Sequence, residues 1–204
     1  MKKIDLALLI GLVAAIFLTN FSSFAENYDA LQGGVVRLHI LANSDSDEDQ
    51  TLKLKVRDEL LAGSDAFFED GKTFYETEKN LEARMDSIQA LAQRVVYENG
   101  YDYTVECALV NMEFDARKYQ GFTMPAGNYD ALRVTIGEAK GHNWWCVMYP
   151  PLCIPAAEKP EELKDVFSEE EINILQNPQN FKFEFKCVEV YKKFKKWLEE
   201  RKAA

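Results

Sequence analysis

VVRLHIL, residues 35–41, is the stretch around which the rest of the fold is organised. Its β-branched and apolar residues alternate with two polar ones, Arg37 and His39, and this alternation is typical of a β-strand. The polar run Asn43-Ser44-Asp45-Ser46-Asp47 follows directly. Residues of this kind favour turns because their side chains hydrogen-bond to nearby backbone groups. The sequence therefore predicts a strand that ends in a tight polar turn.

Helical patterns follow on the C-terminal side of this turn. The first covers residues 47–61, with acidic residues in its first turn, where the helix dipole favours them, and Gly63 just past its end. Its apolar face is formed by residues four apart: Leu52, Val56 and Leu60. A second helix is predicted over residues 78–98 and stops at Asn99-Gly100.

Three more segments alternate like strands: residues 103–114, 129–136 and 144–149. The last two flank a turn that contains two glycines, so we expect them to form a hairpin. A short helix is predicted near residues 161–175, and residues 181–185 are a candidate fifth strand. The order of elements predicts an α+β fold, with a mostly antiparallel sheet of four to five strands and helices packed on it.

Residues 1–25 have the three-part pattern of a secretory signal peptide. Met1-Lys2-Lys3 precedes thirteen uncharged residues, 6–18, and Ser23-Phe24-Ala25 places small residues for a cut after Ala25. A helix of thirteen residues spans about 20 Å, which is short of the ~30 Å hydrocarbon core. The alternatives are a retained N-terminal anchor and a buried core helix. The favoured division is a signal peptide at 1–25, a folded domain at 26–154 and a C-terminal extension at 155–204, packed on the same domain.

The composition is that of a folded, acidic protein. The 204 residues include 34 acidic and 24 basic side chains, for a net charge of −10, and 47% are apolar. This apolar fraction excludes a wholly disordered chain. Cleavage after Ala25 would remove two lysines and one aspartate, and would leave a charge of −11. The acidic balance argues against nucleic-acid binding, because a polyanion would be repelled over most of the surface.

All four cysteines lie after the proposed signal: Cys107, Cys146, Cys153 and Cys187. An even number outside the cytoplasm permits two disulfides, and three pairings are open. Cys146–Cys153 would close a short local loop, which leaves Cys107–Cys187 as the long-range pair, and this is the pairing we favour.

The residues do not form a recognisable metal or catalytic motif. The run 43–49 is similar to the start of a calcium loop, but it lacks glycine at position six and glutamate at position twelve in both registers, so a turn and an acidic helix start explain it better. A zinc site would lack the usual paired short spacings, and its ligands would come from His142, Cys146, Cys153 and either His39 or Cys107. No nucleophile elbow accompanies the two histidines. We therefore predict no catalytic residue, no metal ligand and no cofactor.

The most unusual segment is NWWCVMYPPLC, residues 143–153. Trp144 and Trp145 are adjacent on a predicted strand, so their side chains point to opposite faces. One can fill the core, and the other is left for a second layer, a partner or a membrane interface. Pro150 and Pro151, with a Cys146–Cys153 bridge, would stiffen the loop and reduce the entropy lost on binding. The alternative is that both indoles belong to the core.

The C-terminal segment, residues 187–201, carries an apolar stripe of Val190, Phe194 and Trp197 surrounded by lysines. We expect this stripe to pack on the sheet, with the lysines in solvent. A helix on a membrane surface is the alternative.

Four blocks of this sequence resemble the stage II sporulation protein R family. They are residues 37–47 (RLHILANSDSD), 55–58 (KVRD), 125–137 (PAGNYDALRVTIG) and 141–153 (GHNWWCVMYPPLC), and the match covers roughly residues 35–154. The family motifs nominate structural or contact positions and no catalytic ones: Arg37, Asn43, Asp45, Asn143, Trp144, Trp145, Cys146, Pro150, Pro151 and Cys153.

The resemblance implies a signalling protein of endospore-forming bacteria, secreted across the forespore membrane into the intermembrane space. Members activate a membrane-embedded aspartic protease, the sporulation sigma-E factor processing peptidase, which processes pro-sigma-E. The implied partner is thus this peptidase, beside a membrane, with no nucleic acid and no small-molecule substrate. The residues alone leave two alternatives open, which are an exported envelope hydrolase and a structural protein of the intermembrane space.

Overall fold

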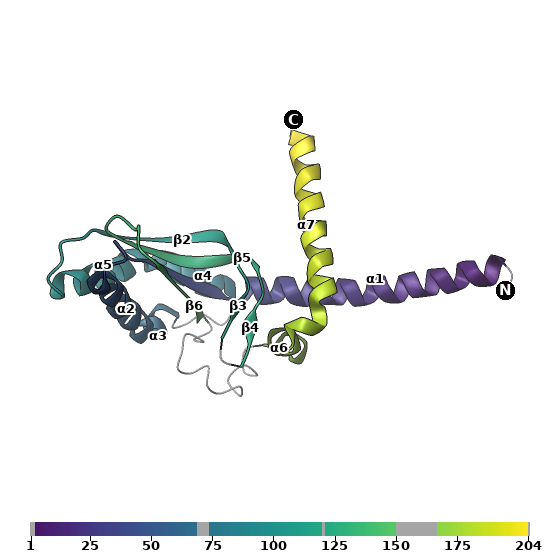
Figure 1. Cartoon of the computed structure of the whole chain (residues 1–204), viewed down its shortest axis with the longest axis horizontal. Coiled ribbons are helices and arrows are strands. Elements are labelled where there is room, and N and C mark those ends of the chain that lie inside the picture. The colour runs from purple at the N-terminus through teal and green to yellow at the C-terminus, as the bar shows by residue number, and fades with distance from the viewer. Residues whose placement is uncertain (1–2, 69–73, 120, 150–166, 204) are drawn as a thin grey trace.

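The molecule is elongated, with a long N-terminal helix at one end and a sheet with its helices at the other (Figure 1). This computed structural model describes residues 3–68, 74–119, 121–149 and 167–203. Helix α1 (Lys3–Gly33) leads into strand β1 (Val36–Leu41) and helix α2 (Asp47–Ala62). The strand and the helix predicted around the polar turn are therefore confirmed.

Four strands form the main sheet, in the order β2-β5-β1-β6. They are β1, β2 (Val105–Phe114), β5 (Gly127–Ile136) and β6 (Asn143–Tyr149). β1 runs parallel to β5 and antiparallel to β6, and β2 runs antiparallel to β5. The predicted α+β class is confirmed, whereas the mostly antiparallel sheet of four to five strands is corrected to a mixed sheet of four.

The predicted hairpin between β5 and β6 is wrong, because β1 lies between them. Every residue of β1 from Val36 to Ile40 is buried, so this strand is covered on both faces. A strand of this kind is best accommodated in the centre of a sheet, where both of its edges are also hydrogen-bonded. The turn after β5 passes the end of β1 and returns the chain on its far side.

Helices α2 and α5 (Met85–Glu98) pack on one face of the sheet. Leu38 and Ile40 of β1 share this core with Leu52 and Val56 of α2. Short helices α3 (Ser64–Phe68) and α4 (Phe74–Ala83) precede α5. The single helix predicted over residues 78–98 is thus two helices, because the backbone of Arg84 leaves the helical conformation, with φ −103° and ψ 6°.

The other face of the sheet is covered at one end by three elements. These are the C-terminal part of α1, the small ladder of β3 (Arg117–Lys118) with β4 (Thr123–Met124), and α6 (Glu169–Gln176). They enclose a second apolar core whose buried members are Leu31, Val35, Phe114, Phe122, Met124, Tyr129, Ala131, Val147, Phe167 and Leu175.

The C-terminal segment is helical. Helix α6 begins with a capping box at Ser168, and a 3-10 helix, η3 (Pro178–Phe181), leads into α7 (Lys182–Ala203). The predicted fifth strand at residues 181–185 is therefore wrong. Phe181 and Phe185 are four residues apart, so they lie on one helical face, and both rings contact Phe24 of α1. The expected packing of this segment on the sheet is replaced by packing on α1.

Helix α1 continues without a break through Ala25, the residue before the predicted cleavage point. Phe24, Tyr28 and Leu31 are buried, whereas Ile4 to Leu18 are exposed. The segment Ile4–Gly33 is long and apolar enough to cross a membrane. The boundary predicted between residues 25 and 26 therefore falls inside one continuous helix, and that helix fits either a signal peptide or a membrane anchor.

Candidate functional site at the meeting point of the sequence motifs

The first and last motif blocks meet at the end of β1. β1 and the turn after it belong to the first block, and β6 and the turn before it belong to the last. Gly141 brings the two turns together, since its N–H donates to the carbonyl of Ala42 at 3.0 Å. A Cβ atom on Gly141 would lie 2.1 Å from the carbonyl oxygen of Ser44, so only glycine fits there.

The polar turn is held by a dense hydrogen-bond network, which we call the turn clamp. Asp49 of α2 accepts bonds from the Asn43 amide at 2.8 Å and the Ser44 hydroxyl at 2.6 Å. Burial raises the pKa of Asp49, but these hydrogen bonds outweigh it and lower the pKa overall. The side-chain oxygen Oδ1 of Asn43 accepts the backbone N–H of Glu138 at 2.9 Å. The clamp therefore ties α2, the first block and the turn between β5 and β6 together.

Asp45 and His142 form an exposed link between the same two turns. Asp45 Oδ1 lies 2.5 Å from His142 Nδ1 and also accepts the His142 backbone N–H. The side-chain hydrogen bond to His142 lowers the pKa of Asp45. Lys53 reaches the same place from α2 and donates to the His142 carbonyl at 2.8 Å. Lys53 is 4% exposed. Its burial could have been inferred from the sequence, because Lys53 lies next to the apolar face formed by Leu52 and Val56.

Three side chains form a row across the sheet on the face opposite α2 and α5. In the strand register Arg133 of β5 lies beside His39 of β1, and His39 lies beside Trp145 of β6. The His39 and Trp145 rings stack, with centroids 3.6 Å apart and planes inclined by 7°. His39 is buried, Trp145 is half-buried and Arg133 is exposed. Together with exposed Asn143, at the start of β6, these residues form what we call the motif row.

Trp144 points to the other face, as strand alternation predicts. Its ring packs beside the helix-covered core, and the Arg57 guanidinium lies 4.3 Å from its ring centroid. Arg57 belongs to the short motif block KVRD on α2. This cation–π contact therefore connects two blocks that lie far apart in the sequence.

Arg37 is fully buried on β1, among aromatic side chains. Its guanidinium lies 4.4 Å from the Phe114 ring centroid and 5.1 Å from that of Tyr129. It donates to the Tyr119 hydroxyl at 2.9 Å and to the Cys146 carbonyl at 3.3 Å. Burial lowers the pKa of Arg37, although the nearby tyrosines oppose this shift. Arg37 thus has a structural position in the second core.

The cysteines separate into two groups. Cys107 and Cys187 are free thiols, so the predicted pairing of these two is wrong. Cys107 lies on β2 beside the helix-covered core, whereas Cys187 lies on α7 and faces α1. Burial raises the pKa of Cys107 to about 12, which keeps it an unreactive thiol. Cys146 is disulfide-bonded. Cys153, Pro150 and Pro151 lie outside the described residues.

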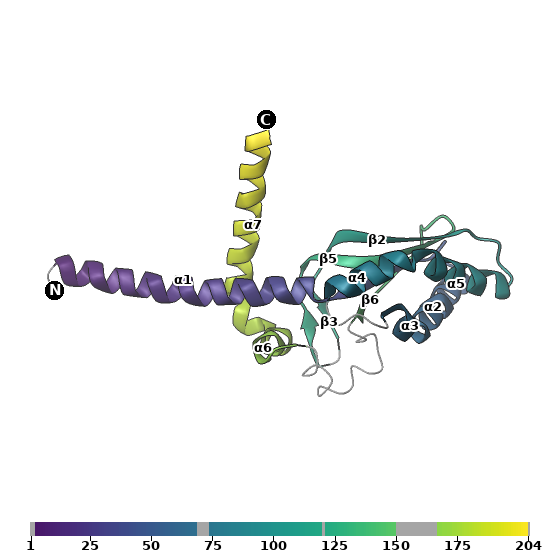
Figure 2. The ribbon, with the colours of Figure 1, turned by 180° about the vertical axis from the view of Figure 1, so that it is seen from behind.

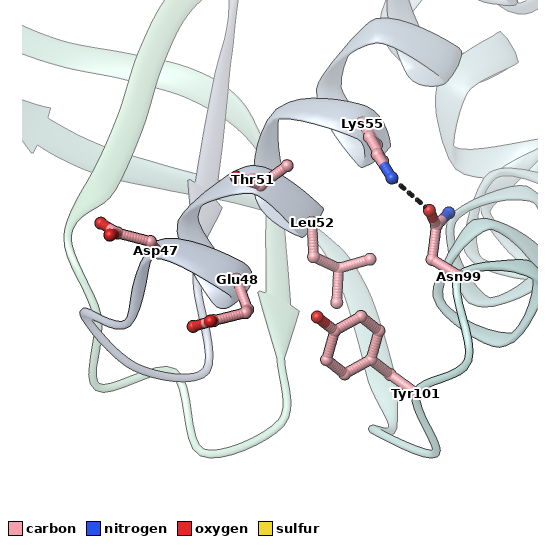
Figure 3. A pocket seen from close by; sticks show the side chains of 7 residues that line it. All are labelled: Asp47, Glu48, Thr51, Leu52, Lys55, Asn99 and Tyr101. Carbon is pink, nitrogen blue, oxygen red and sulfur yellow. Dashed lines mark hydrogen bonds between the residues drawn. The ribbon is translucent and has the colours of Figure 1, made fainter.

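A pocket of about 290 Å³ lies on the helix-covered side of the sheet, between the start of α2 and the loop after α5 (Figure 3). Asp47 and Glu48 form one side, and Lys55 on the other side donates to Asn99 at 2.5 Å. Tyr101 and Leu52 close the pocket. Of its lining residues, Asp47 and Lys55 belong to motif blocks, but the pocket contains no member of the motif row. Among the described residues, no three His, Cys, Asp or Glu side chains are grouped to hold a metal ion.

The sequence did not nominate Lys53 or Arg133 for this site, and it offered His39 only as a possible zinc ligand. Arg133 could have been found from strand alternation, because Leu132, Val134 and Ile136 share one face of β5 and leave Arg133 on the other. The burial of His39 has no local signal. It depends on the later strand β6, which places Trp145 over its ring.

Comparison with known proteins agrees with these motifs. A family model described as stage II sporulation protein R matches residues 32–159. The stage II sporulation protein R of Bacillus subtilis (strain 168) is 33% identical over 130 residues, which are 64% of this chain and 58% of that relative. The match thus spans less than two thirds of the relative's own length. No solved structure matches. The chain belongs to the stage II sporulation protein R family.

Proposed function

We propose that this protein is an exported sporulation signal that activates a membrane-embedded aspartic protease, the sporulation sigma-E factor processing peptidase, and so promotes processing of pro-sigma-E. The protein would act as a ligand and would carry no catalytic residue. A ligand activates a partner only when it binds the partner's active state more tightly than its inactive state. The proposal therefore requires a contact surface on the folded domain.

The observation that carries this proposal is the convergence of the motif blocks in the motif row. Buried Arg37 and half-buried Asn43 have structural contacts that account for them. Trp145, Arg133 and Asn143 differ, because they lie at the surface of one sheet face. Tryptophan and arginine are enriched among residues that dominate protein–protein binding energy. We therefore propose the motif row as the surface that contacts the peptidase.

Co-expression of the full chain with the peptidase and pro-sigma-E in a host without sporulation genes tests this role. Arg133→Glu should reduce the rate of pro-sigma-E cleavage by tenfold or more. The substitution replaces a positive charge in the contact by a negative one, which the peptidase would either repel or leave unpaired. The matched control is Arg94→Glu on α5. Arg94 is also exposed, but it lies on the opposite side of the sheet. Equal cleavage by both variants and the unchanged protein would refute the motif row as the contact surface.

The N-terminal sequence is consistent with a folded domain that lies outside the cytoplasm. Lys2 and Lys3 precede the apolar segment, and Glu26 and Asp29 follow it. Basic residues stay preferentially on the cytoplasmic side of a membrane, so the folded domain would lie on the outer side. We propose that export across the forespore membrane places it in the intermembrane space.

We further propose that the bond of Cys146 is made with Cys153. The two residues are seven positions apart, and an oxidising compartment favours such a short bridge. Mass spectrometry of the unreduced exported protein should find a peptide pair linked through these positions. Alkylation of both as free thiols would contradict the pairing.

A further inference from the structure

Helix α7 has an apolar face that no described residue of the folded domain covers. Its large side chains are Phe183, Val190, Tyr191, Phe194 and Trp197, and between 45% and 60% of each is exposed. Phe183 and Val190 are seven residues apart, which is about two helical turns, and the others follow within two further turns, so they form one stripe along the helix. The remaining surface is basic. α7 carries eight basic and four acidic side chains, for a net charge of +4 in a chain of net charge −10.

The apolar face of α7 and its opposite face contact α1 at positions that are far apart along α1. On the apolar face, the Phe183 ring lies 5.8 Å from that of Phe17. On the opposite face, Lys192 forms an ion pair with Asp29 at 2.9 Å, twelve residues further along α1. Twelve residues of helix correspond to about 18 Å. The apolar face of α7 is therefore directed toward the N-terminal half of α1, away from the sheet.

The N-terminal half of α1 has the properties of a membrane-spanning segment. None of its most apolar 18-residue window is buried. Residues 4–21 correspond to about 27 Å of helix, close to the ~30 Å hydrocarbon core. Both views of the molecule show α7 lying crosswise to α1, near the middle of the chain's long axis (Figure 1, Figure 2). If α1 crosses a bilayer, α7 therefore lies in the plane of that bilayer's surface.

We infer that α1 is retained as a membrane anchor and that the apolar face of α7 is inserted into the outer surface of the same bilayer, among acidic phospholipids. A groove of about 440 Å³ joins the two helices and is lined by side chains that include Leu18, Phe21 and Val190. Acyl chains around α1 would fill this groove. Aromatic side chains favour the boundary between hydrocarbon and water, and exposed Trp197 and Tyr191 of α7 would lie there.

The charge of α7 favours anionic lipid over a second copy of this chain. A second copy would bring two helices of charge +4 together, which is unfavourable. Anionic headgroups instead attract each lysine or arginine near the surface. Lys186 and Lys193 flank the apolar stripe and share Glu189 between them. An amphipathic helix with basic flanks is the usual form of an interfacial helix.

Fluorescence quenching of the full chain in vesicles tests this inference. The vesicles contain phosphatidylglycerol and phosphatidylcholine with brominated acyl chains, which quench only indoles in contact with the bilayer. Bromolipid should quench part of the tryptophan emission, and Trp197→Phe should abolish the quenched part. The matched control is Trp144→Phe, because Trp144 lies in the folded domain over α2. This control should leave the quenched part unchanged.

Four outcomes would overturn the inference. One is quenching that survives Trp197→Phe. Another is equal quenching in vesicles of phosphatidylcholine alone, which would refute the preference for acidic lipid. The third is loss of residues 1–25 from the membrane-extracted protein by intact-mass measurement. A chain that stays in detergent as a dimer, crosslinked through α7 and unquenched in vesicles, would assign the apolar face to self-association instead. None of these readouts depends on the peptidase.

Discussion

His39 is an uncharged histidine in a buried setting. It is 3% exposed, it is covered by the Trp145 ring, and neither of its ring nitrogens has a hydrogen-bond partner among the described residues. Burial, and then the positive charge of Arg133, lower the pKa of His39 from 6.5 to about 4. The folded protein therefore binds the His39 proton only at acidic pH, whereas the unfolded chain binds it below about pH 6.5.

This difference predicts a stability that depends on pH. Between pH 6.5 and 4 the unfolded state binds more protons at this position, so stability falls as pH falls through that window. The contribution from His39 should amount to about 2 kcal/mol between pH 7 and pH 5. His39→Phe, which keeps a ring against Trp145, should remove this part of the slope. The measurement is the free energy of unfolding in urea at several pH values.

The control for this prediction is His142→Gln. His142 is exposed and bonded to Asp45, so its replacement should leave the His39 part of the slope in place. An unchanged slope in His39→Phe would show that other groups cause the pH dependence.

Arg37 shows how a buried strand can carry a cation. The sequence pattern presents it as a polar site that alternates with apolar ones, which suggests exposure. In the structure, its guanidinium lies over two aromatic rings and donates to a hydroxyl and a backbone carbonyl. These partners come from β2, β5, β6 and the residue after β3. Local periodicity could not have identified them.

At the scale of elements, the turn clamp joins the first motif block, residues 37–47, to α2 and to the turn after β5. Gly137 follows β5 with φ +58°, and a Cβ atom there would lie 2.3 Å from Asn43 Oδ1. Asn43 would have to move, which would break its bonds to Asp49 and to the Glu138 backbone. The glycine is thus required both for its backbone conformation and for the approach of Asn43.

We predict that Gly137→Ala destabilises the protein by more than Gly121→Ala. Gly121 has φ +81°, but no atom of the described part of the chain lies within 4 Å of its Cβ position, so its replacement should cost only the left-handed strain, about 1–2 kcal/mol. Gly137→Ala should cost a further ~1–3 kcal/mol from the broken hydrogen bonds. Urea unfolding of both variants measures the difference. Equal losses would indicate that Asn43 moves aside without cost.

The meeting of the motif blocks at the end of β1 could be predicted in part from the sequence. The strands, the polar turn and the opposite orientation of Trp144 and Trp145 follow from local periodicity, and the structure has them. The central position of β1 could not be foreseen, because strand order depends on which edges remain unpaired in the whole sheet. The hairpin prediction failed for this reason.

At the scale of the whole molecule, an aromatic cluster attaches the two terminal helices to each other. Phe24 stacks on Phe181 with centroids 5.5 Å apart and meets Phe185 edge-on at 5.2 Å. Phe24 is 6% exposed, and Ile174 and Val188 complete the cluster. The N-terminal helix and the C-terminal segment thereby form one structural unit. Neither segment could form this cluster by itself, because its rings come from both.

Phe24→Ala should therefore loosen α7 while the sheet stays intact. Truncation of a buried phenylalanine costs about 3–5 kcal/mol, and the loss should be local because the cluster is separate from the two main cores. Hydrogen exchange of the full chain in detergent should show at least ~100-fold less protection in α7, with β1 and β5 unchanged. Phe194→Ala is the matched control, since Phe194 lies on α7 itself but is 54% exposed. Protection lost equally in both variants, or in the sheet, would contradict a local cluster.

The sequence by itself determined the elements and the family: the first strand, the helix after it, the apolar N-terminal segment and the motif blocks all depend on neighbours within one or two turns of chain. Tertiary structure alone decided that β1 occupies the centre of a mixed sheet, that Arg37 and His39 are buried, and that α7 packs on α1. The physical reason is the same in each case. These arrangements depend on contacts between segments about 90 to 160 residues apart, and such contacts leave no period in the local sequence.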